Sequence, residues 1–189
     1  QAAETHTENV NYNANYSVIS PTITGYTPNQ EVVSGTMGTE PVTVNVIYTV
    51  NSYEITTSVN PTAGGSVTGA NSYNYGASAT LTATANEGYT FVNWTKNGSE
   101  VSTNATYTFT VTEAGEYSAN FSLNSYNVTA SASPAEGGSV TGTGTYNHGV
   151  SATLTATANE GYTFVNWTKN GTEVSTNATY TFTVTEAGE

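Results

Sequence analysis

The strongest constraint on the fold of this chain is an internal repeat. Residues 53–116 align on residues 126–189 at a constant offset of 73, with 13 differences over 64 positions. Twelve of these differences lie in the first part of the alignment, and from residue 78 onward only Ser99 differs, being Thr172 in the second copy. A period of this length indicates one structural unit copied in tandem.

The repeat divides the chain of 189 residues into three units. Residues 1–51 share no similarity with the copies and form a separate β-rich unit, the first copy occupies 52–124, and the second occupies 125–189. An Asn-Ser dipeptide precedes the first tyrosine of each copy, so the linkers between units are very short. We interpret the chain as a slice of a longer secreted protein.

Each copy has the pattern of β-strands joined by turns. Small apolar residues alternate with Ser and Thr from Ser78 to Ala85, which is typical of a half-buried strand. The Asn97-Gly98 pair predicts a tight hairpin turn, because both residues tolerate positive φ. Neither copy shows a helix-length apolar pattern of period 3.6. The sequence therefore predicts an all-β protein of three small β-rich modules in a linear tandem array.

Two further alternations give expectations about strands. Alternate residues from Val42 to Val50 are apolar, which predicts one buried strand face in the first unit. In the strand that ends at Trp94, Val92 and Trp94 share one parity and Tyr89 and Phe91 share the other. We expect one of these sets to fill the core and the other to cover an outer surface or a module junction.

Charged residues are scarce in this chain, and this scarcity excludes several classes of function. There are 14 acidic side chains, all of them Glu, and 2 basic ones, so the net charge is 2 − 14 = −12. Nucleic-acid binding and polybasic membrane anchoring both need basic groups, so we expect no nucleic-acid partner and no membrane insertion. The absence of Cys excludes disulfides, thiolate metal sites and thiol nucleophiles.

The titratable residues do not form a recognisable catalytic or metal site. Only His148 lies in a repeat, and its counterpart is Tyr75; the other histidine, His6, lies in the first unit. Glu87 and Glu160 occupy equivalent Glu-Gly turns, one in each copy, whereas a glycosidase needs two carboxylates at close range. We therefore expect no enzyme activity, no metal ion and no cofactor.

Lys96 and Lys169 could in principle form Lys–Asn isopeptide crosslinks, as in some surface domains. Such a lysine must be buried beside an asparagine and an acid, and these two follow Trp by two positions at an Asn-Gly turn. We expect them at an exposed hairpin tip instead.

Trp94 and Trp167 are the candidate ligand-binding residues. A tryptophan face can bind a sugar ring, and the alternative is packing in the core. Of the two, the sequence favours packing, since large aromatic residues are mostly buried.

Both copies resemble a known family. The run Gly-Gly-Ser-Val-Thr-Gly at 64–69 and the run from Ala77 to Trp94 resemble the divergent InlB B-type repeat of bacterial surface proteins, and both motifs return in the second copy. The resemblance implies β-rich, roughly β-grasp-like modules on secreted or surface-anchored proteins, with no catalytic residues. The first unit is similar to a MucBP-like (mucin-binding-protein) repeat in its Gly25-Tyr-Thr and Val42–Tyr48 segments; by that likeness it lacks a first strand.

These features lead to expectations about function. We expect a non-enzymatic tandem-repeat stalk segment of a secreted, cell-surface, adhesin-like protein. Binding of host glycans, mucin or other surface proteins, and an accessory role in a secreted polysaccharide-degrading enzyme, are the alternatives. The second copy ends at the equivalent of Glu116, before the counterpart of the Tyr117–Leu123 strand. We therefore expect that copy to be frayed, or completed by strand exchange with another chain.

Overall fold

The computed structural model describes residues 5–187 and confirms the all-β class. Strands make up 54% of the structure and helix 3%. The outer ends of the first and third predicted units, residues 1–4 and 188–189, lie outside the described residues.

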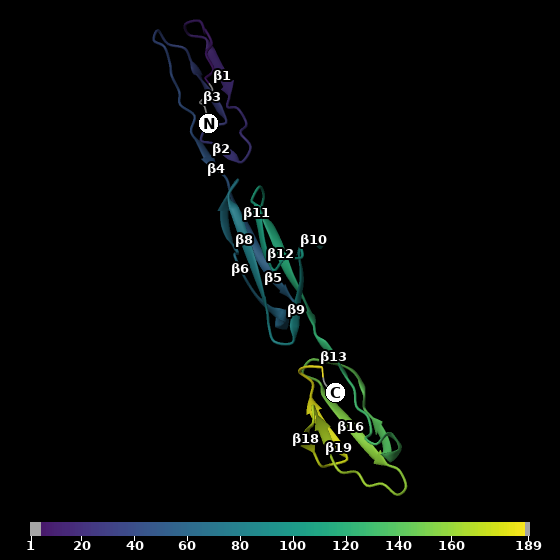
Figure 1. The fold of residues 1–189 in the computed structure, drawn as a ribbon. Helices are drawn as coiled ribbons and strands as arrows, with labels where there is room; N and C mark the ends of the chain where they lie inside the picture. Colours follow the sequence, from purple (N-terminus) through teal and green to yellow (C-terminus); the bar gives the residue numbers. More distant parts are fainter. Residues whose placement is uncertain (1–4, 188–189) are drawn as a thin grey trace. The chain divides into compact units, whose positions relative to one another are not determined.

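The first unit consists of two short antiparallel strand pairs (Figure 1). Strand β1 (Asn15–Ile19) pairs with β3 (Val32–Thr36), and β2 (Tyr26–Pro28) pairs with β4 (Tyr48–Val50). Between residues 5 and 51 the only buried side chain is that of Ser20, whose hydroxyl donates a hydrogen bond of 2.6 Å to the Gln30 carbonyl. This unit is therefore held by strand pairing rather than by an apolar core.

The expected strand from Val42 to Val50 is wrong over most of its length. Only β4, its last three residues, is a strand, and the side chains of Val42 and Val44 are 51% and 44% exposed. An alternating pattern becomes a strand only where a neighbour accepts its backbone hydrogen bonds, and residues 41–47 pair with no strand in the described structure.

The first repeat forms two sheets. Its elements are β5 (Ser52–Asn60), the 3-10 turn η1 (Thr62–Gly64), β6 (Gly65–Thr68), β7 (Asn71–Asn74), β8 (Ser78–Ala85), β9 (Tyr89–Lys96), β10 (Ser99–Ser102), β11 (Thr106–Thr110) and β12 (Gly115–Leu123). One sheet has the strand order β10-β9-β12-β5-β7, and the other has the order β11-β8-β6. Strand β12 is thus the middle strand of the larger sheet.

The alternation in β8 is confirmed. Ala79 and Leu81 are 0% exposed, while the hydroxyl of Thr80 on the opposite face lies 2.9 Å from that of Thr108. The predicted Asn97-Gly98 turn is also present, with φ of +51° and +80°. In β8 the small apolar residues therefore face the core and the threonines face the other way, as their alternation predicts.

The parity argument for β9 is wrong because a β-bulge interrupts the strand. Asn120 of β12 is opposite Asn93, but Phe121 is opposite Phe91, so Val92 has no partner and is 45% exposed. A bulge reverses the faces of the residues that follow it. Phe91 therefore packs on the same side as Trp94, with ring centroids 6.0 Å apart.

The second repeat keeps one sheet of the first and loses the continuity of the other. Its elements are β13 (Ser125–Val128), the 3-10 turn η2 (Ala135–Gly137), β14 (Gly138–Thr141), β15 (Gly144–Asn147), β16 (Ser151–Ala158), β17 (Trp167–Lys169), β18 (Thr172–Ser175) and β19 (Thr179–Thr183). The three-stranded sheet β14-β16-β19 repeats β6-β8-β11. The counterpart of the five-stranded sheet is split into the pairs β13-β15 and β17-β18.

The division of this sheet reflects the lack of a middle strand among the described residues. No strand equivalent to β12 exists among the described residues, so the strands that would flank it shorten. The eight-residue β9 is matched by the three-residue β17, and the nine-residue β5 by the four-residue β13.

The β-grasp-like arrangement that the resemblance implies is not what the strands form. A β-grasp fold packs an α-helix against its sheet, and the only helical segments within residues 5–187 are the three-residue turns η1 and η2. The repeats are accordingly all-β.

Contacts divide the chain into two compact units, and the division passes through the first repeat. One unit takes the described residues up to 56 together with 69–80 and 108–116. The other takes 57–68, 81–107 and the described residues from 117 onward.

Candidate functional site

Two asparagines lie where one predicted unit meets the next, and both make the same hydrogen bonds. Asn51 is the single residue between β4 and β5. Its N–H donates to the Gly25 carbonyl at 2.8 Å, and its carbonyl accepts from the Tyr75 N–H at 2.8 Å. Its side-chain oxygen accepts a third hydrogen bond, from the Thr27 hydroxyl at 2.6 Å.

Asn124, the single residue between β12 and β13, repeats this arrangement. Its N–H donates to the Gly88 carbonyl at 2.8 Å and its carbonyl accepts from the His148 N–H at 2.8 Å. The Thr90 hydroxyl donates to its side-chain oxygen at 2.7 Å. We call each of these two arrangements a joint. In the division of the chain into two compact units by contacts, all residues of the first joint lie in one compact unit and all residues of the second joint lie in the other.

A glycine covered by an aromatic ring completes each joint. Gly25 and Gly88 have φ of +79° and +78°, a region that favours glycine. A Cβ on Gly25 would overlap the Tyr75 ring, and a Cβ on Gly88 would overlap the ring of His148. Glycine is therefore required at both positions for conformation and for space.

A second ring supports each covering ring. Tyr53 meets Tyr75 edge-on, with centroids 6.5 Å apart, and Tyr126 meets His148 at 6.2 Å. The joints differ in one respect: Nδ1 of His148 is buried without a hydrogen-bond partner. A tyrosine at that position carries no ring nitrogen to satisfy.

Sequence reasoning missed the joints, although a signal was present. The tripeptide Gly-Tyr-Thr occurs at 25–27 in the first unit and at 88–90 in the first repeat, and it recurs at 161–163. Its spacing to the following Asn-Ser differs between the first unit and the repeat, so a search at the fixed offset of 73 does not align it.

The predicted ligand-binding residues Trp94 and Trp167 are buried, at 0% and 8% exposure. The indole Nε1 of Trp94 donates to the Ala105 carbonyl at 3.1 Å, and that of Trp167 donates to the Asn177 carbonyl at 3.1 Å. The Trp94 indole is fully enclosed, and the Trp167 indole, though buried, lies in the lining of the groove described below. Packing, the interpretation that the sequence favoured, agrees with their burial.

The two lysines lie beside polar and aromatic partners. The ammonium of Lys96 is 5.5 Å from the centroid of the Tyr117 ring, a cation–π distance. Lys169 donates to Glu186 at 2.8 Å, and this hydrogen bond, together with the positive charge, lowers the pKa of the Glu186 carboxyl. Lys96 is half-buried rather than at an exposed tip, because its side chain lies along the neighbouring strand.

The remaining titratable candidates show no shared site. His6 lies 3.4 Å from Glu8 on the surface, and Glu87 and Glu160 are exposed in their turns. Within residues 5–187, no three His, Cys, Asp or Glu residues gather as metal ligands would, and no helix has the length and apolar character needed to span a membrane.

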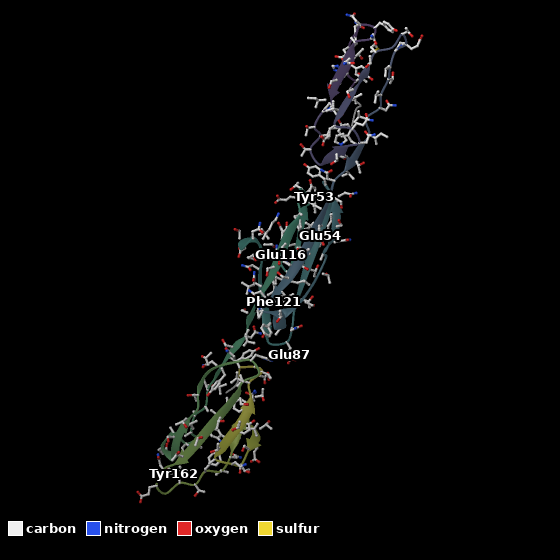
Figure 2. All side chains as sticks on the ribbon, turned by 180° about the vertical axis from the view of Figure 1, so that it is seen from behind. Tyr53, Glu54, Glu87, Glu116, Phe121 and Tyr162 are labelled. Carbon is white, nitrogen blue, oxygen red and sulfur yellow. The ribbon has the colours of Figure 1, made fainter. Side chains whose placement is uncertain are left out.

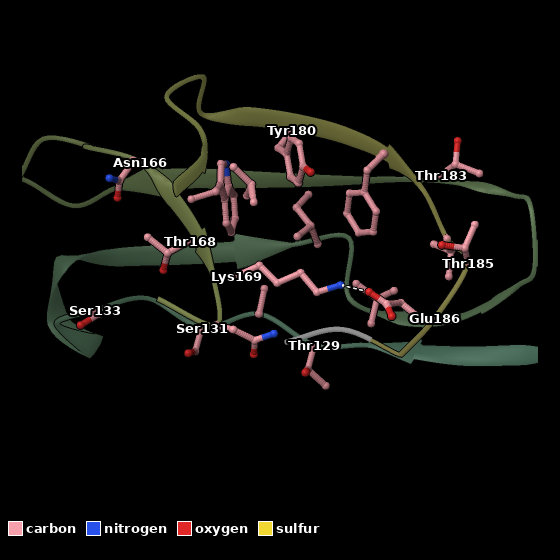
Figure 3. A pocket seen from close by; sticks show the side chains of 18 residues that line it. Thr129, Ser131, Ser133, Asn166, Thr168, Lys169, Tyr180, Thr183, Thr185 and Glu186 are labelled. Atoms are coloured by element: carbon pink, nitrogen blue, oxygen red, sulfur yellow. Dashed lines mark hydrogen bonds and ion pairs between the residues drawn. The ribbon is translucent and has the colours of Figure 1, made fainter. Parts of the chain in front are cut away.

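A groove lies in the second repeat between the separated strand pairs. Its volume is about 580 Å³, and it runs between Val128 on β13 and Trp167 on β17. Figure 3 shows the Lys169–Glu186 ion pair inside this groove.

Comparison with known proteins identifies the repeats. The all-β sheets, the tandem identity and the repeated joint define a tandem-repeat protein. The family model of the divergent InlB B-repeat domain matches residues 55–125 and 126–189. The chain therefore belongs to the divergent InlB B-repeat family. No curated protein and no solved structure shows significant similarity to it.

The match to the family begins at residue 55. The likeness of residues 1–51 to a MucBP-like repeat thus rests on the sequence alone and stays a prediction.

Gly88→Ala tests the joint. The added Cβ displaces the His148 ring, so we expect amide protection of Asn124 and His148 to fall at least tenfold in hydrogen exchange. Gly161→Ala is the matched control, because Gly161 has φ of +82° and nothing lies within 4 Å of a Cβ placed on it. It carries the same backbone cost, about 1 kcal/mol, without touching a ring. Equal protection of Asn124 in both variants would show that the covering ring is dispensable.

Exchange of the covering rings gives a reciprocal test. His148→Tyr removes the buried Nδ1 that has no partner, so we expect the second repeat to gain about 1 kcal/mol in urea unfolding. Tyr75→His should cost the first repeat a similar amount. The idea fails if His148→Tyr lowers the stability.

Proposed function

We propose that this chain is a non-enzymatic stalk segment of a secreted bacterial cell-surface protein of the adhesin type. The observation that carries the proposal is the repeated joint, since a stalk needs the same connection between successive units. Membership of a family of surface repeats supports the bacterial surface as its location.

The construction of the joints suits the transmission of force. Only one residue separates the last strand of each unit from the first strand of the next, and that residue makes three hydrogen bonds. Short connections held on both sides leave little slack, unlike Gly/Ser linkers, which behave as flexible coils.

The path of the chain through the first repeat supports the same role. The chain enters on β5 and leaves on β12, and these strands are neighbours in the five-stranded sheet. Asn60 of β5 donates to the Asn120 side chain of β12 at 3.0 Å. A pull on the two ends of this repeat is therefore resisted directly by the hydrogen bonds between entry and exit strands.

The surface chemistry agrees with a spacer. Only 8% of residues are charged, and the outer faces of the strands carry hydroxyl pairs such as Thr153–Thr181, 2.8 Å apart. Uncharged hydrogen bonds are insensitive to ionic screening, which acts on separated charges. Such a segment keeps its structure when the salt concentration around a cell changes.

Single-molecule pulling tests the stalk role. We expect the first repeat to give a distinct unfolding event with a resolvable force peak, because its entry and exit strands are neighbours in one sheet. Asn60→Ala should lower the force of that event, because it removes a bond between the entry and exit strands; Ser133→Ala at the matched position should not. Unfolding of the first repeat without a resolvable force peak would contradict a role in resisting tension.

Binding of glycans or mucin is the alternative function, and a direct binding assay distinguishes it from the stalk role. No observation favours it at Trp94 or Trp167, which are buried. We expect no binding of the folded chain on an array of mucin-type and plant or bacterial glycans. Specific saturable binding there would replace the stalk with a recognition role, and release of sugar from any of those glycans would replace it with an enzymatic one.

A further inference from the structure

The three-stranded sheet of the second repeat has an outer face made only of hydroxyl-bearing side chains. On its inner face Val140, Leu154 and Phe182 pack in the core of the repeat. The alternate residues point the other way, because successive side chains of a strand lie on opposite faces. We call this surface the hydroxyl face. Its nine residues are Ser139 and Thr141 of β14, Ser151, Thr153, Thr155 and Thr157 of β16, and Thr179, Thr181 and Thr183 of β19.

The strands hold these side chains in regular rows. β16 pairs with β14 on one edge and with β19 on the other, and both ladders keep one register throughout (Figure 1). Thr155 lies at the centre, opposite Thr141 on one side and Thr179 on the other. Neighbouring strands are about 4.8 Å apart, and alternate residues of one strand are about 6.7 Å apart. The hydroxyl face is therefore a grid with two fixed spacings.

The hydroxyl face is open to solvent. Thr155 is half-buried between its neighbours, and the other eight residues are exposed. Among the described residues, the only hydrogen bond between two hydroxyls of this face joins Thr153 and Thr181. The remaining hydroxyls can bond to water, and the threonine methyl groups beside them restrict the orientation of the water that they cannot bond. The face therefore orders a layer of water on a regular grid.

Charged groups lie away from the hydroxyl face. The sequences of β14, β16 and β19 contain no charged residue. Glu160 follows β16 in a turn, as Glu87 follows β8 in the first repeat, where Figure 2 labels it. The face thus offers neither carboxylates for a mineral surface or a metal ion nor ammonium groups for an anionic one.

These properties limit the kind of partner that fits. A sugar ring binds against the flat apolar area of an aromatic side chain, and the hydroxyl face carries no aromatic residue. A second copy of the chain has the same net charge of −12, which opposes association of two such faces. The partner that remains has a surface that is itself an uncharged, regular array of hydrogen-bonding groups.

Ice has such a surface. The oxygen atoms on a prism plane of ice repeat at two spacings close to those between neighbouring strands and between alternate residues of a strand. Each water molecule of the lattice both donates and accepts hydrogen bonds, as a threonine hydroxyl does. Water held over the grid of hydroxyl and methyl groups can therefore take up positions of the ice lattice.

We propose that the hydroxyl face binds ice, with Thr155 at the centre of the site. The first repeat carries the same nine residue types at the matching sequence positions, with Thr82 in place of Thr155. A variant that lacks the site must therefore be changed in both copies. The inference does not depend on the stalk role.

Partition into ice tests the proposal on the full chain. Polycrystalline ice is grown slowly from a solution that also contains a globular protein without threonine rows on its surface. Growing ice rejects solutes that do not bind it. We expect the chain to be enriched in the ice about tenfold over that protein, which corresponds to about 1.4 kcal/mol of preference for the ice.

Substitutions locate the site. Thr82→Lys combined with Thr155→Lys should lower the enrichment about fivefold or more, because a charged group keeps its own hydration water. Thr103→Lys combined with Thr176→Lys is the matched control, since both threonines are exposed in bends outside the three strands. It adds the same charge and should leave the enrichment unchanged.

A second pair of variants guards against loss of the fold. Thr108→Lys combined with Thr181→Lys changes the same face on an edge strand, where lysine is well tolerated. We expect the same loss of enrichment, with amide protection of the sheet retained.

Three results would overturn the proposal. Growing ice could exclude the native chain as it excludes the other protein, or the face variants could partition like the control variant. Binding to crystalline cellulose or chitin, or self-association in sedimentation, that the face substitutions abolish would assign the face to a polysaccharide or to a second copy. Loss of the stalk role in pulling experiments would leave ice binding untouched.

Discussion

The middle strand of the larger sheet decides how each repeat is built. A strand inside a sheet forms hydrogen bonds on both edges, so β12 holds β9 on one side and β5 on the other. Where no such strand is described, the flanking elements shorten to β17 and β13 and the sheet divides. The other sheet and the tryptophan remain in place, because their contacts come from described residues between Val128 and Val184.

The same preference for uncharged polar contacts runs through the strands and the joints. With two lysines in the whole chain, ion pairs cannot organise its surface. Main-chain groups, threonine hydroxyls and asparagine amides do so instead, as at Asn51 and Asn124. Each such bond is modest, at about 1 kcal/mol, but several at one residue define a single arrangement.

Local patterns predicted much of the fold. The alternation in β8 and the Asn97-Gly98 turn are present as expected, since each depends on neighbouring residues alone. The side of Phe91 was missed, and of the strand expected from Val42 to Val50 only the last three residues form one, because both features depend on a partner strand. The bulge at Val92 and the lack of a described partner strand for residues 41–47 depend on how strands pair, which the alternation within one segment does not encode.

The candidate sites followed the same rule. The groove in the second repeat was not predicted from the sequence, and both its position and its lining came from the structure. The joints were not predicted, because their residues come from three separate segments. Tyr75 and His148 are different residues at equivalent positions of the alignment. In the structure each ring covers the glycine of its joint.

Each repeat carries both faces of the joint: Gly88-Tyr-Thr toward one neighbour, and Asn-Ser-Tyr with an aromatic residue toward the other. Duplication of one gene segment therefore yields a longer protein with no new interface to evolve. Recombination between near-identical copies can equally shorten it. Length becomes a quantity that a lineage can adjust in steps of 73 residues.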